Sequence, residues 1–156
     1  GAEHFHDLGK LLFAFTVFWA YIGFSQYFLI WYGNIPEETI FFRHRLFGSW
    51  SAVSLLLAAG HFVVPFFFFM PRTVKRKPAL LAVGASWMLL MHAVDLHWLI
   101  MPALHPQGVA VGLLDLAAFL AVGGSFVGAV SWMMLGAPLV PVGDPRLGES
   151  LSFENF

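Results

Sequence analysis

Five ionisable side chains fall inside long uncharged stretches of the sequence: His61, His92, Asp95, His97 and Asp115. An ionisable group inside a membrane segment costs several kcal/mol unless it faces protein or water, so each position is a candidate functional site. A carboxylate beside an imidazole in a low-dielectric setting forms a coupled pair that can accept a proton and pass it on. The spacing of these five residues therefore indicates which of them can interact and transfer a proton.

The most suggestive pair is His92 and Asp95, which are three residues apart and so share one face of a helix. Asp95 is expected to lie about 10 Å below the outer end of its helix, with His92 about one turn deeper. His97 projects about 200° around the helix from Asp95 and is expected in the interface. His92 and Asp95 predict either a proton relay or hydrogen bonds that only lock helices together, and both alternatives stay open.

Two further polar positions are expected at the depth of Asp95. Asp115 follows the start of the last uncharged stretch by about six residues, and Gln26 precedes the end of the first stretch by a similar number, so both lie about 10 Å deep. We therefore expect these two positions and the neighbouring Ser25 to form one polar layer with Asp95 in the outer half of the membrane, with His92 one turn deeper. For Asp115 a proton-path role and a structural role are equally compatible with the sequence.

His61 lies near the middle of its stretch, and His92 lies slightly past the middle of the next. Two imidazoles at matching depth on facing helices are what a b-type haem with two histidine ligands needs. Against haem, the sequence has no second histidine pair at depth and no deep basic residues for the propionates. His61 is thus interpreted as a hydrogen-bonded structural histidine, a deeper step of a proton path, or a haem ligand.

Four uncharged stretches must position these residues, and each is close to the roughly 20 residues that a membrane-spanning helix needs. They predict helices at about 11–32, 47–70, 79–101 and 109–135, followed by an extended polar tail over 136–156. The expected fold is an all-α polytopic transmembrane helix bundle that forms a single domain over 1–156. The spacing of Gly124 and Gly128 favours close helix packing around the fourth helix.

Composition agrees with a membrane protein. Of the 156 residues, 59% are hydrophobic and 11% are charged, against about 25% charged in soluble domains. A net charge of −1 gives no support for a nucleic-acid partner, and the absence of cysteine excludes disulfides and cysteine-ligated clusters. No motif for a catalytic nucleophile, a metal site or a nucleotide is present, so we expect no catalytic residue, no bound metal and no autonomous catalysis.

Basic residues predict the orientation of the helices, because loops rich in Lys and Arg stay on the cytoplasmic side. One side holds only Arg43 and Arg45. The other side holds six basic residues, and both chain termini are therefore expected in the cytoplasm: Lys10, Arg72, Lys75, Arg76, Lys77 and Arg146. The cluster at 72–77 also favours contact with anionic lipid headgroups.

Several longer motifs carry a resemblance to a known family. They are HDLGKLLF (6–13), FWAY (18–21), FSQYFLIWY (24–32), NIPEET (34–39) and DPRLGESLSFEN (144–155). These runs resemble the C-terminal part of the ActF membrane subunits of bacterial alternative complex III, which belong to the NrfD/polysulfide-reductase-like membrane family. The chain departs from that pattern in lacking the family's N-terminal helices.

The resemblance implies an integral subunit of a quinol:electron-acceptor oxidoreductase in respiratory or photosynthetic electron transfer, placed in the bacterial inner membrane. It implies that the chain itself binds no cofactor, that haem and iron–sulfur clusters sit in partner subunits, and that quinol is the substrate of the assembly. The implied partners are other membrane subunits, especially an ActC-like one, lipid, and a terminal oxidase or other electron acceptor.

Membrane subunits of this family are discussed as quinol-binding and proton-conducting elements. The resemblance carries that role to residues already singled out above, with His61 as a deeper step: Gln26, His92, Asp95 and Asp115. The runner-up hypotheses are a purely structural membrane scaffold and a b-type haem-binding bundle.

Overall fold

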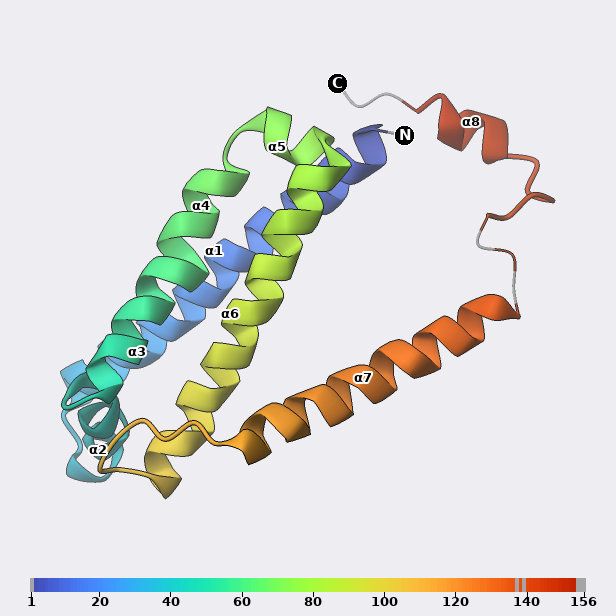
Figure 1. Ribbon diagram of the computed structural model, residues 1–156. Helices are drawn as coiled ribbons and strands as arrows, with labels where there is room; N and C mark the ends of the chain where they lie inside the picture. Colours follow the sequence, from blue (N-terminus) through green and yellow to red (C-terminus); the bar gives the residue numbers. More distant parts are fainter. Residues whose placement is uncertain (1, 137, 139, 154–156) are drawn as a thin grey trace. The chain divides into compact units, whose positions relative to one another are not determined.

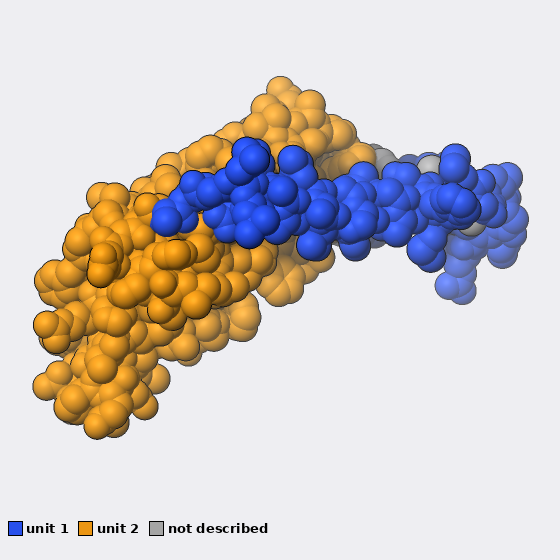
Figure 2. Space-filling view, turned by 60° about the horizontal axis from the view of Figure 1, so that its bottom comes forward, with its two compact units in different colours: residues 1, 110–156 blue, residues 2–109 orange. Residues whose placement is uncertain are grey.

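The chain is all-α over the part that its computed structural model describes, residues 2–136, 138 and 140–153, where no strand occurs. Contacts between Cα atoms divide it into two compact units, coloured separately in Figure 2. The first unit covers Ala2–Val109, and the second runs from Ala110 onward. The expected single domain over 1–156 stays a prediction, and the two units are described separately below.

In the part of the chain that the structure describes, four helices are long and apolar enough to cross a membrane. Three are α1 (Ala2–Gly33), α6 (Pro78–Leu104) and α7 (Leu113–Leu135). The fourth, Trp50–Phe69, is continuous but built from α3 (Trp50–Leu57), a π-helical segment η1 (Ala58–Val63) and α4 (Val64–Phe69). The prediction of four helices of membrane-spanning length is confirmed.

Within the described residues, three shorter helices lie outside the four predicted spans: α2 (Pro36–Leu46), α5 (Arg72–Arg76) and α8 (Leu147–Leu151). In α2, Pro36 occupies the first helical turn with Glu37 and Glu38, and Arg45 lies in the last turn. Proline and acidic residues favour helix starts and basic residues favour helix ends, so this sequence suits a helix. α8 corrects our expectation of a fully extended tail.

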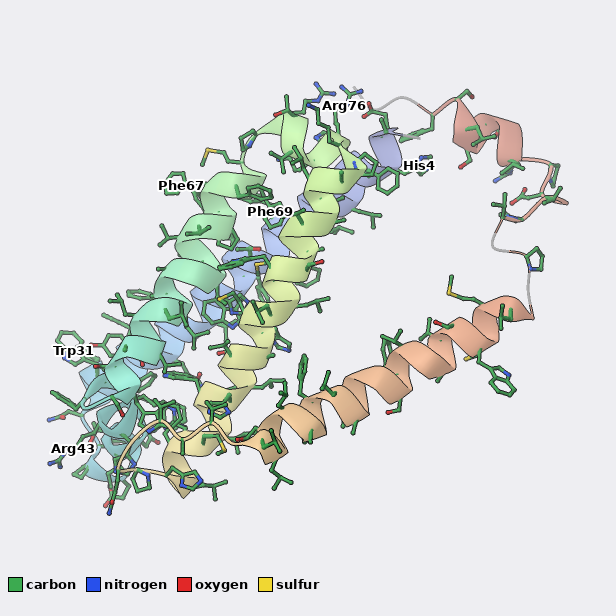
Figure 3. All side chains as sticks on the ribbon, in the orientation of Figure 1. His4, Trp31, Arg43, Phe67, Phe69 and Arg76 are labelled. Atoms are coloured by element: carbon green, nitrogen blue, oxygen red, sulfur yellow. The ribbon has the colours of Figure 1, made fainter. Side chains whose placement is uncertain are left out.

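In the first unit, α1, the α3–α4 helix and α6 run side by side (Figure 1). Their apolar core is small and includes Trp50, Leu57, Phe69, Leu81 and Met91. Many large apolar side chains face outward instead, which suits a chain surrounded by lipid. Along α4, for instance, Phe67 points away from the bundle and Phe69 points toward α6 (Figure 3).

Polar groups share this interior. The buried face of α1 carries Glu3, His6, Gly9 and Thr16, at spacings that place them along one side of the helix. Arg45, His61 and Asp95 are also buried. Because lipid offers such groups no hydrogen bonds, each needs a partner within protein, and their partners define the candidate sites.

No residue of α7 is buried. A Cβ atom added at Gly124 or at Gly128 would meet nothing within 4 Å. The close helix packing that we expect around these two glycines thus stays a prediction.

Candidate functional site

Asp95 of α6 is buried and accepts a hydrogen bond of 3.0 Å from Nε1 of Trp19 on α1. The Trp19 ring lies beside the imidazole of His61, with 4.0 Å between ring centroids. The centroid of His61 is in turn 6.3 Å from that of His92 on α6. These four residues, Trp19, His61, His92 and Asp95, form the central cluster, to which all three long elements of the first unit contribute.

The π-helical segment η1 presents His61 to this cluster. Its register is set by the Val64 N–H, which donates to the carbonyl of Ala59, five residues earlier. The next bond in that register would run from residue 65 to the Gly60 carbonyl, but Pro65 has no N–H to donate. The Nε1–H of Trp87 on α6 donates to that carbonyl instead, at 2.7 Å. Single π turns of this kind are frequent at functional sites.

The structure pairs the predicted residues differently from the sequence argument. We expected His92 to be the partner of Asp95, one turn away on the same helix. Among the described residues, the side chain that hydrogen-bonds to the Asp95 carboxylate is Trp19, and the imidazole ring nearest to that of His92 is His61. Asp95 is buried whereas His92 is exposed, so the two differ in solvation although they share a helix face.

A pocket of about 390 Å³ opens between α1 and α6 beside this cluster. Its walls are mainly apolar, and its polar lining residues are Thr16, Trp19, His61 and His92. Nδ1 of His61 is buried and has no hydrogen-bond partner among the described residues. The site thus combines a buried carboxylate with two imidazoles, one of which has a buried nitrogen without a hydrogen-bond partner in the described part of the chain.

The remaining predicted site residues lie elsewhere. Gln26 is exposed on α1, seven residues beyond Trp19, which is about 10 Å farther along the helix. Asp115 belongs to the second unit, where its Oδ2 accepts a hydrogen bond of 2.8 Å from the Gly112 N–H and so caps its own helix. The structure thus brings His61, His92 and Asp95 together but leaves Gln26 outside the cluster.

A second buried polar site, missed in the sequence, surrounds Arg45 of α2. Its Nε and Nη2 donate to the carbonyls of Trp98 and Leu99 on α6, at 3.2 and 2.7 Å, and its Nη1 donates to the Phe41 carbonyl at 2.8 Å. The Trp98 carbonyl needs such a donor because Pro102, four residues later, lacks the N–H that would bond to it.

Other contacts complete this Arg45 cluster, which we define as Arg45, Ser54, Trp98 and Phe41. The guanidinium carbon lies 3.5 Å from the ring centroid of Phe41. Trp98 Nε1 donates to Ser54 Oγ at 2.8 Å, and Ser54 Oγ donates to the Arg45 carbonyl at 2.6 Å. Burial lowers the pKa of Arg45 from its ordinary value, yet an arginine stays protonated in proteins. The sequence signal that could have indicated this site is Pro102 inside a long helix.

His97 lies near this second site. Its ring centroid is 5.8 Å from that of Trp50, and its Nε2 is buried without a hydrogen-bond partner among the described residues. The interfacial position that we expect for His97 remains a prediction.

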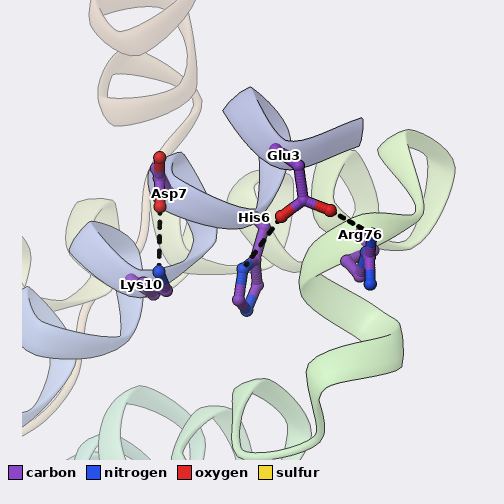
Figure 4. A network of polar contacts seen from close by, with 5 residues as sticks. All are labelled: Glu3, His6, Asp7, Lys10 and Arg76. Atoms are coloured by element: carbon purple, nitrogen blue, oxygen red, sulfur yellow. Dashed lines mark hydrogen bonds and ion pairs between the residues drawn. The ribbon is translucent and has the colours of Figure 1, made fainter. Parts of the chain in front are cut away.

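A third polar group joins the start of α1 to α5 (Figure 4). The buried carboxylate of Glu3 accepts a hydrogen bond from Arg76, and its other oxygen lies 3.8 Å from Nδ1 of His6. Gly9 lets the two helices meet here, because a Cβ at this position would lie 2.8 Å from the Cβ of Lys75. From the sequence, the basic residues at 72–77 are expected only to orient the helices and to contact anionic lipid headgroups, so the contact of Arg76 with Glu3 was not predicted.

Within the described residues, no group of three or more His, Asp or Glu side chains could hold a metal ion. No protein-family model and no curated protein sequence matches the chain.

Proposed function

We propose that the chain is an integral membrane subunit of a quinol:electron-acceptor oxidoreductase resembling alternative complex III, in which the central cluster forms part of a proton-conducting path. In this proposal the haem and iron–sulfur clusters belong to partner subunits, among them an ActC-like one, and quinol is oxidised by the assembly. The chain contributes no autonomous catalysis.

The observation that carries the proposal is the burial of Asp95 beside two imidazoles. A carboxylate in a membrane helix is costly, and such groups mark proton relays when they lie next to other titratable side chains. Trp19 holds Asp95 in place by a hydrogen bond of 3.0 Å. His61 and His92 extend the titratable chain from the interior toward the pocket between α1 and α6.

The proposed location is the bacterial inner membrane with both termini in the cytoplasm. Basic segments stay on the cytoplasmic side, and the basic helix α5 lies at the end of the first unit opposite to α2 (Figure 1). On the side of α2, the Arg45 guanidinium is held by backbone carbonyls of α6, whereas Arg43 is exposed.

The test is the Asp95→Asn variant in the assembled complex, reconstituted in vesicles with a pH indicator outside. Because Asn cannot carry the proton, we expect quinol-driven proton release and turnover to fall about tenfold or more. Glu37→Gln, at an exposed position of α2, is the matched control and should leave both rates unchanged. Unchanged proton release and turnover in Asp95→Asn would show that the relay proposal is wrong.

A purely structural scaffold is the second candidate function, and the Trp19–Asp95 hydrogen bond between α1 and α6 favours it. A scaffold role predicts that Asp95→Asn lowers the yield or thermal stability of the assembly while the assembled fraction turns over normally. Measuring both quantities on the same preparation separates the two functions.

A b-type haem site is the third candidate, since His61 and His92 do lie on neighbouring helices with their ring centroids 6.3 Å apart. Two axial histidines give a haem a strong Soret band. The purified chain should therefore show no such band if the proton-path proposal holds, and a band lost in both His61→Phe and His92→Phe would favour haem.

A further inference from the structure

The helix that carries His61 is fixed to α6 at both of its ends. At the start of α3, the Trp50 Nε1–H donates to the His105 carbonyl at 3.0 Å. At the end of α4, the buried ring of Phe69 lies against α6, where a Cβ atom at Gly84 would be 2.5 Å from it. Contacts with α6 therefore set the rotation of both helix ends about the helix axis.

The π turn between these ends takes up one extra residue. A π turn closes a hydrogen bond over five residues, whereas an α turn closes it over four. In a regular α-helix the two ends would therefore be rotated against each other by about 100°, the angle per residue, and could not both keep their contacts with α6. The fixed ends thus require a π turn between Trp50 and Phe69, but they do not determine its position.

The Trp87 indole determines that position. Because Pro65 has no N–H, a π turn at Ala58–Val63 leaves the Gly60 carbonyl without its backbone donor. The Nε1–H of Trp87 on α6 donates to this carbonyl at 2.7 Å. If the turn lay elsewhere, residue 65 would be in α register, and Pro65 would free the carbonyl of His61 instead of that of Gly60. The bond from Trp87 therefore favours the observed position.

The position of the turn decides where His61 points, because His61 is the fourth of the six residues of η1. A turn lying wholly before or wholly after His61 would rotate its side chain by up to about 100° about the helix axis. In the observed position, the centroid of the His61 ring is 4.0 Å from that of Trp19 and 6.3 Å from that of His92. The contacts of His61 within the central cluster thus depend on where the π turn lies.

We propose that Trp87 is a positioning residue of the central cluster: by donating to the Gly60 carbonyl it holds the π turn in place and keeps the His61 imidazole inside the cluster. Trp87 acts through His61 and transfers no proton itself. The transfer of a proton by His61 rests on the proposed function, whereas the placement of His61 by Trp87 does not.

The position of His61 can be measured through its contact with Trp19. The full chain, with ¹³C and ¹⁵N labels in histidine and tryptophan, is placed in lipid bilayers, and solid-state NMR records cross-peaks between the two kinds of ring. The Trp19–His61 pair, with centroids 4.0 Å apart, should give a strong cross-peak, which Trp19→Phe identifies by removing it. The Trp50–His97 pair, with centroids 5.8 Å apart, should give a weaker cross-peak and serves as an internal reference.

Trp87→Phe keeps an aromatic ring and removes the donor. We expect the Trp19–His61 cross-peak to fall about threefold or more relative to the reference, since a buried carbonyl without a donor disfavours the observed turn position. Trp132→Phe, at a side chain that is 80% exposed on α7, is the matched control and should leave both cross-peaks unchanged.

A second substitution separates the hydrogen bond of Trp87 from its packing. Pro65→Ala returns an N–H to residue 65, which can donate to the Gly60 carbonyl within the same π turn. The double variant Trp87→Phe/Pro65→Ala should therefore recover the Trp19–His61 cross-peak. If Trp87 only filled space beside η1, restoring a backbone donor would not bring His61 back.

Loss of the Trp19–His61 cross-peak alone, followed by recovery in the double variant, supports the proposal. The proposal is wrong if Trp87→Phe leaves both cross-peaks intact, or if the double variant recovers nothing. It is also wrong if Trp87→Phe removes both cross-peaks, because Trp87 would then support the whole bundle rather than position His61.

Proton release by the assembled complex separates this inference from the proposed function. Trp87→Phe should lower proton release by the same factor as His61→Phe, and combining the two substitutions should lower it no further, because both act through one group. A lost cross-peak with normal proton release would keep the positioning role of Trp87 and reject a proton path through His61. An intact cross-peak in Trp87→Phe, together with blocked proton release in Asp95→Asn, would do the reverse.

Discussion

The central cluster and the Arg45 cluster each lie beside a helix carbonyl that a proline leaves without its backbone donor, but they differ in how fully their side chains are hydrogen-bonded. In each, a proline inside a helix frees a carbonyl that a side chain from another helix then satisfies: Trp87 for the carbonyl freed by Pro65, and Arg45 for the one freed by Pro102. The Arg45 guanidinium uses Nε, Nη1 and Nη2 in hydrogen bonds. In the central cluster, Nδ1 of His61 is left unpartnered within the described residues.

We interpret this difference as a difference in role: the Arg45 cluster stabilises the fold, and the central cluster performs the chemistry. Buried polar groups in proteins are almost always hydrogen-bonded, so a saturated site such as that of Arg45 needs no explanation beyond stability. A buried polar atom without a hydrogen-bond partner lowers stability. Such an atom is expected at a site where a proton or a ligand is exchanged. Removing side chains from the two clusters should therefore affect stability in one and function in the other.

Arg45→Ala should have the largest effect on stability. It removes the donor to the Trp98 carbonyl, which Pro102 leaves without a backbone partner, and the bonds to the Leu99 and Phe41 carbonyls. We therefore expect a loss of about 2–5 kcal/mol in the free energy of unfolding. Thermal or denaturant unfolding in detergent micelles, followed by circular dichroism, measures it. Arg43→Ala is the matched control at an exposed position of the same helix and should be nearly neutral (Figure 3). Equal losses in the two variants would contradict the structural role of Arg45.

Trp87→Phe should have the next largest effect, because it removes the donor to the Gly60 carbonyl but keeps an aromatic ring. An unsatisfied buried carbonyl costs about 1–3 kcal/mol. Trp132→Phe, at a side chain that is 80% exposed on α7, is the control in the same unfolding measurement. If Trp87→Phe were as stable as the unsubstituted chain, the π-helical segment would not depend on this bond.

Trp19→Phe should have a comparable effect, about 1–3 kcal/mol, since it removes the hydrogen bond to the buried Asp95 carboxylate and leaves the ring beside His61. Trp31→Phe tests the same change at an exposed position of α1. In the assembled complex we also expect slower proton release, because Asp95 loses the group that orients it. A loss of stability with unchanged proton release would favour the scaffold function.

Much of the fold could be predicted from the sequence because the bilayer limits helix length. The four predicted helices correspond to α1, the α3–α4 helix, α6 and α7, since uncharged runs of about 20 residues leave few alternatives. The helix α2 could also have been predicted, from Pro36 at its start and the basic residues at its end.

The candidate site was predictable only in part. Burial of Asp95 and the involvement of His61 and His92 follow from placing ionisable residues in apolar helices. The hydrogen-bond partner of Asp95 could not be predicted in this way, because Trp19 and Asp95 are separated by 76 residues. The helical spacing on α6 alone favours His92 as the partner. The π turn could not be predicted either, since it depends on a hydrogen bond from Trp87 to the Gly60 carbonyl, 27 residues away in the sequence.

The smallest expected change in stability comes from His61→Phe, and it tests the comparison most directly. Because Nδ1 of His61 has no partner among the described residues, replacing the imidazole by a ring of similar size loses no hydrogen bond there. We expect the free energy of unfolding to change by no more than about 0.5 kcal/mol, as for His44→Phe at an exposed position of α2. Proton release in the assembled complex should nevertheless fall, because the imidazole between Trp19 and His92 is gone. A stability loss as large as that of Arg45→Ala would mean that His61 holds the fold in the way Arg45 does, and the distinction between the two clusters would fail.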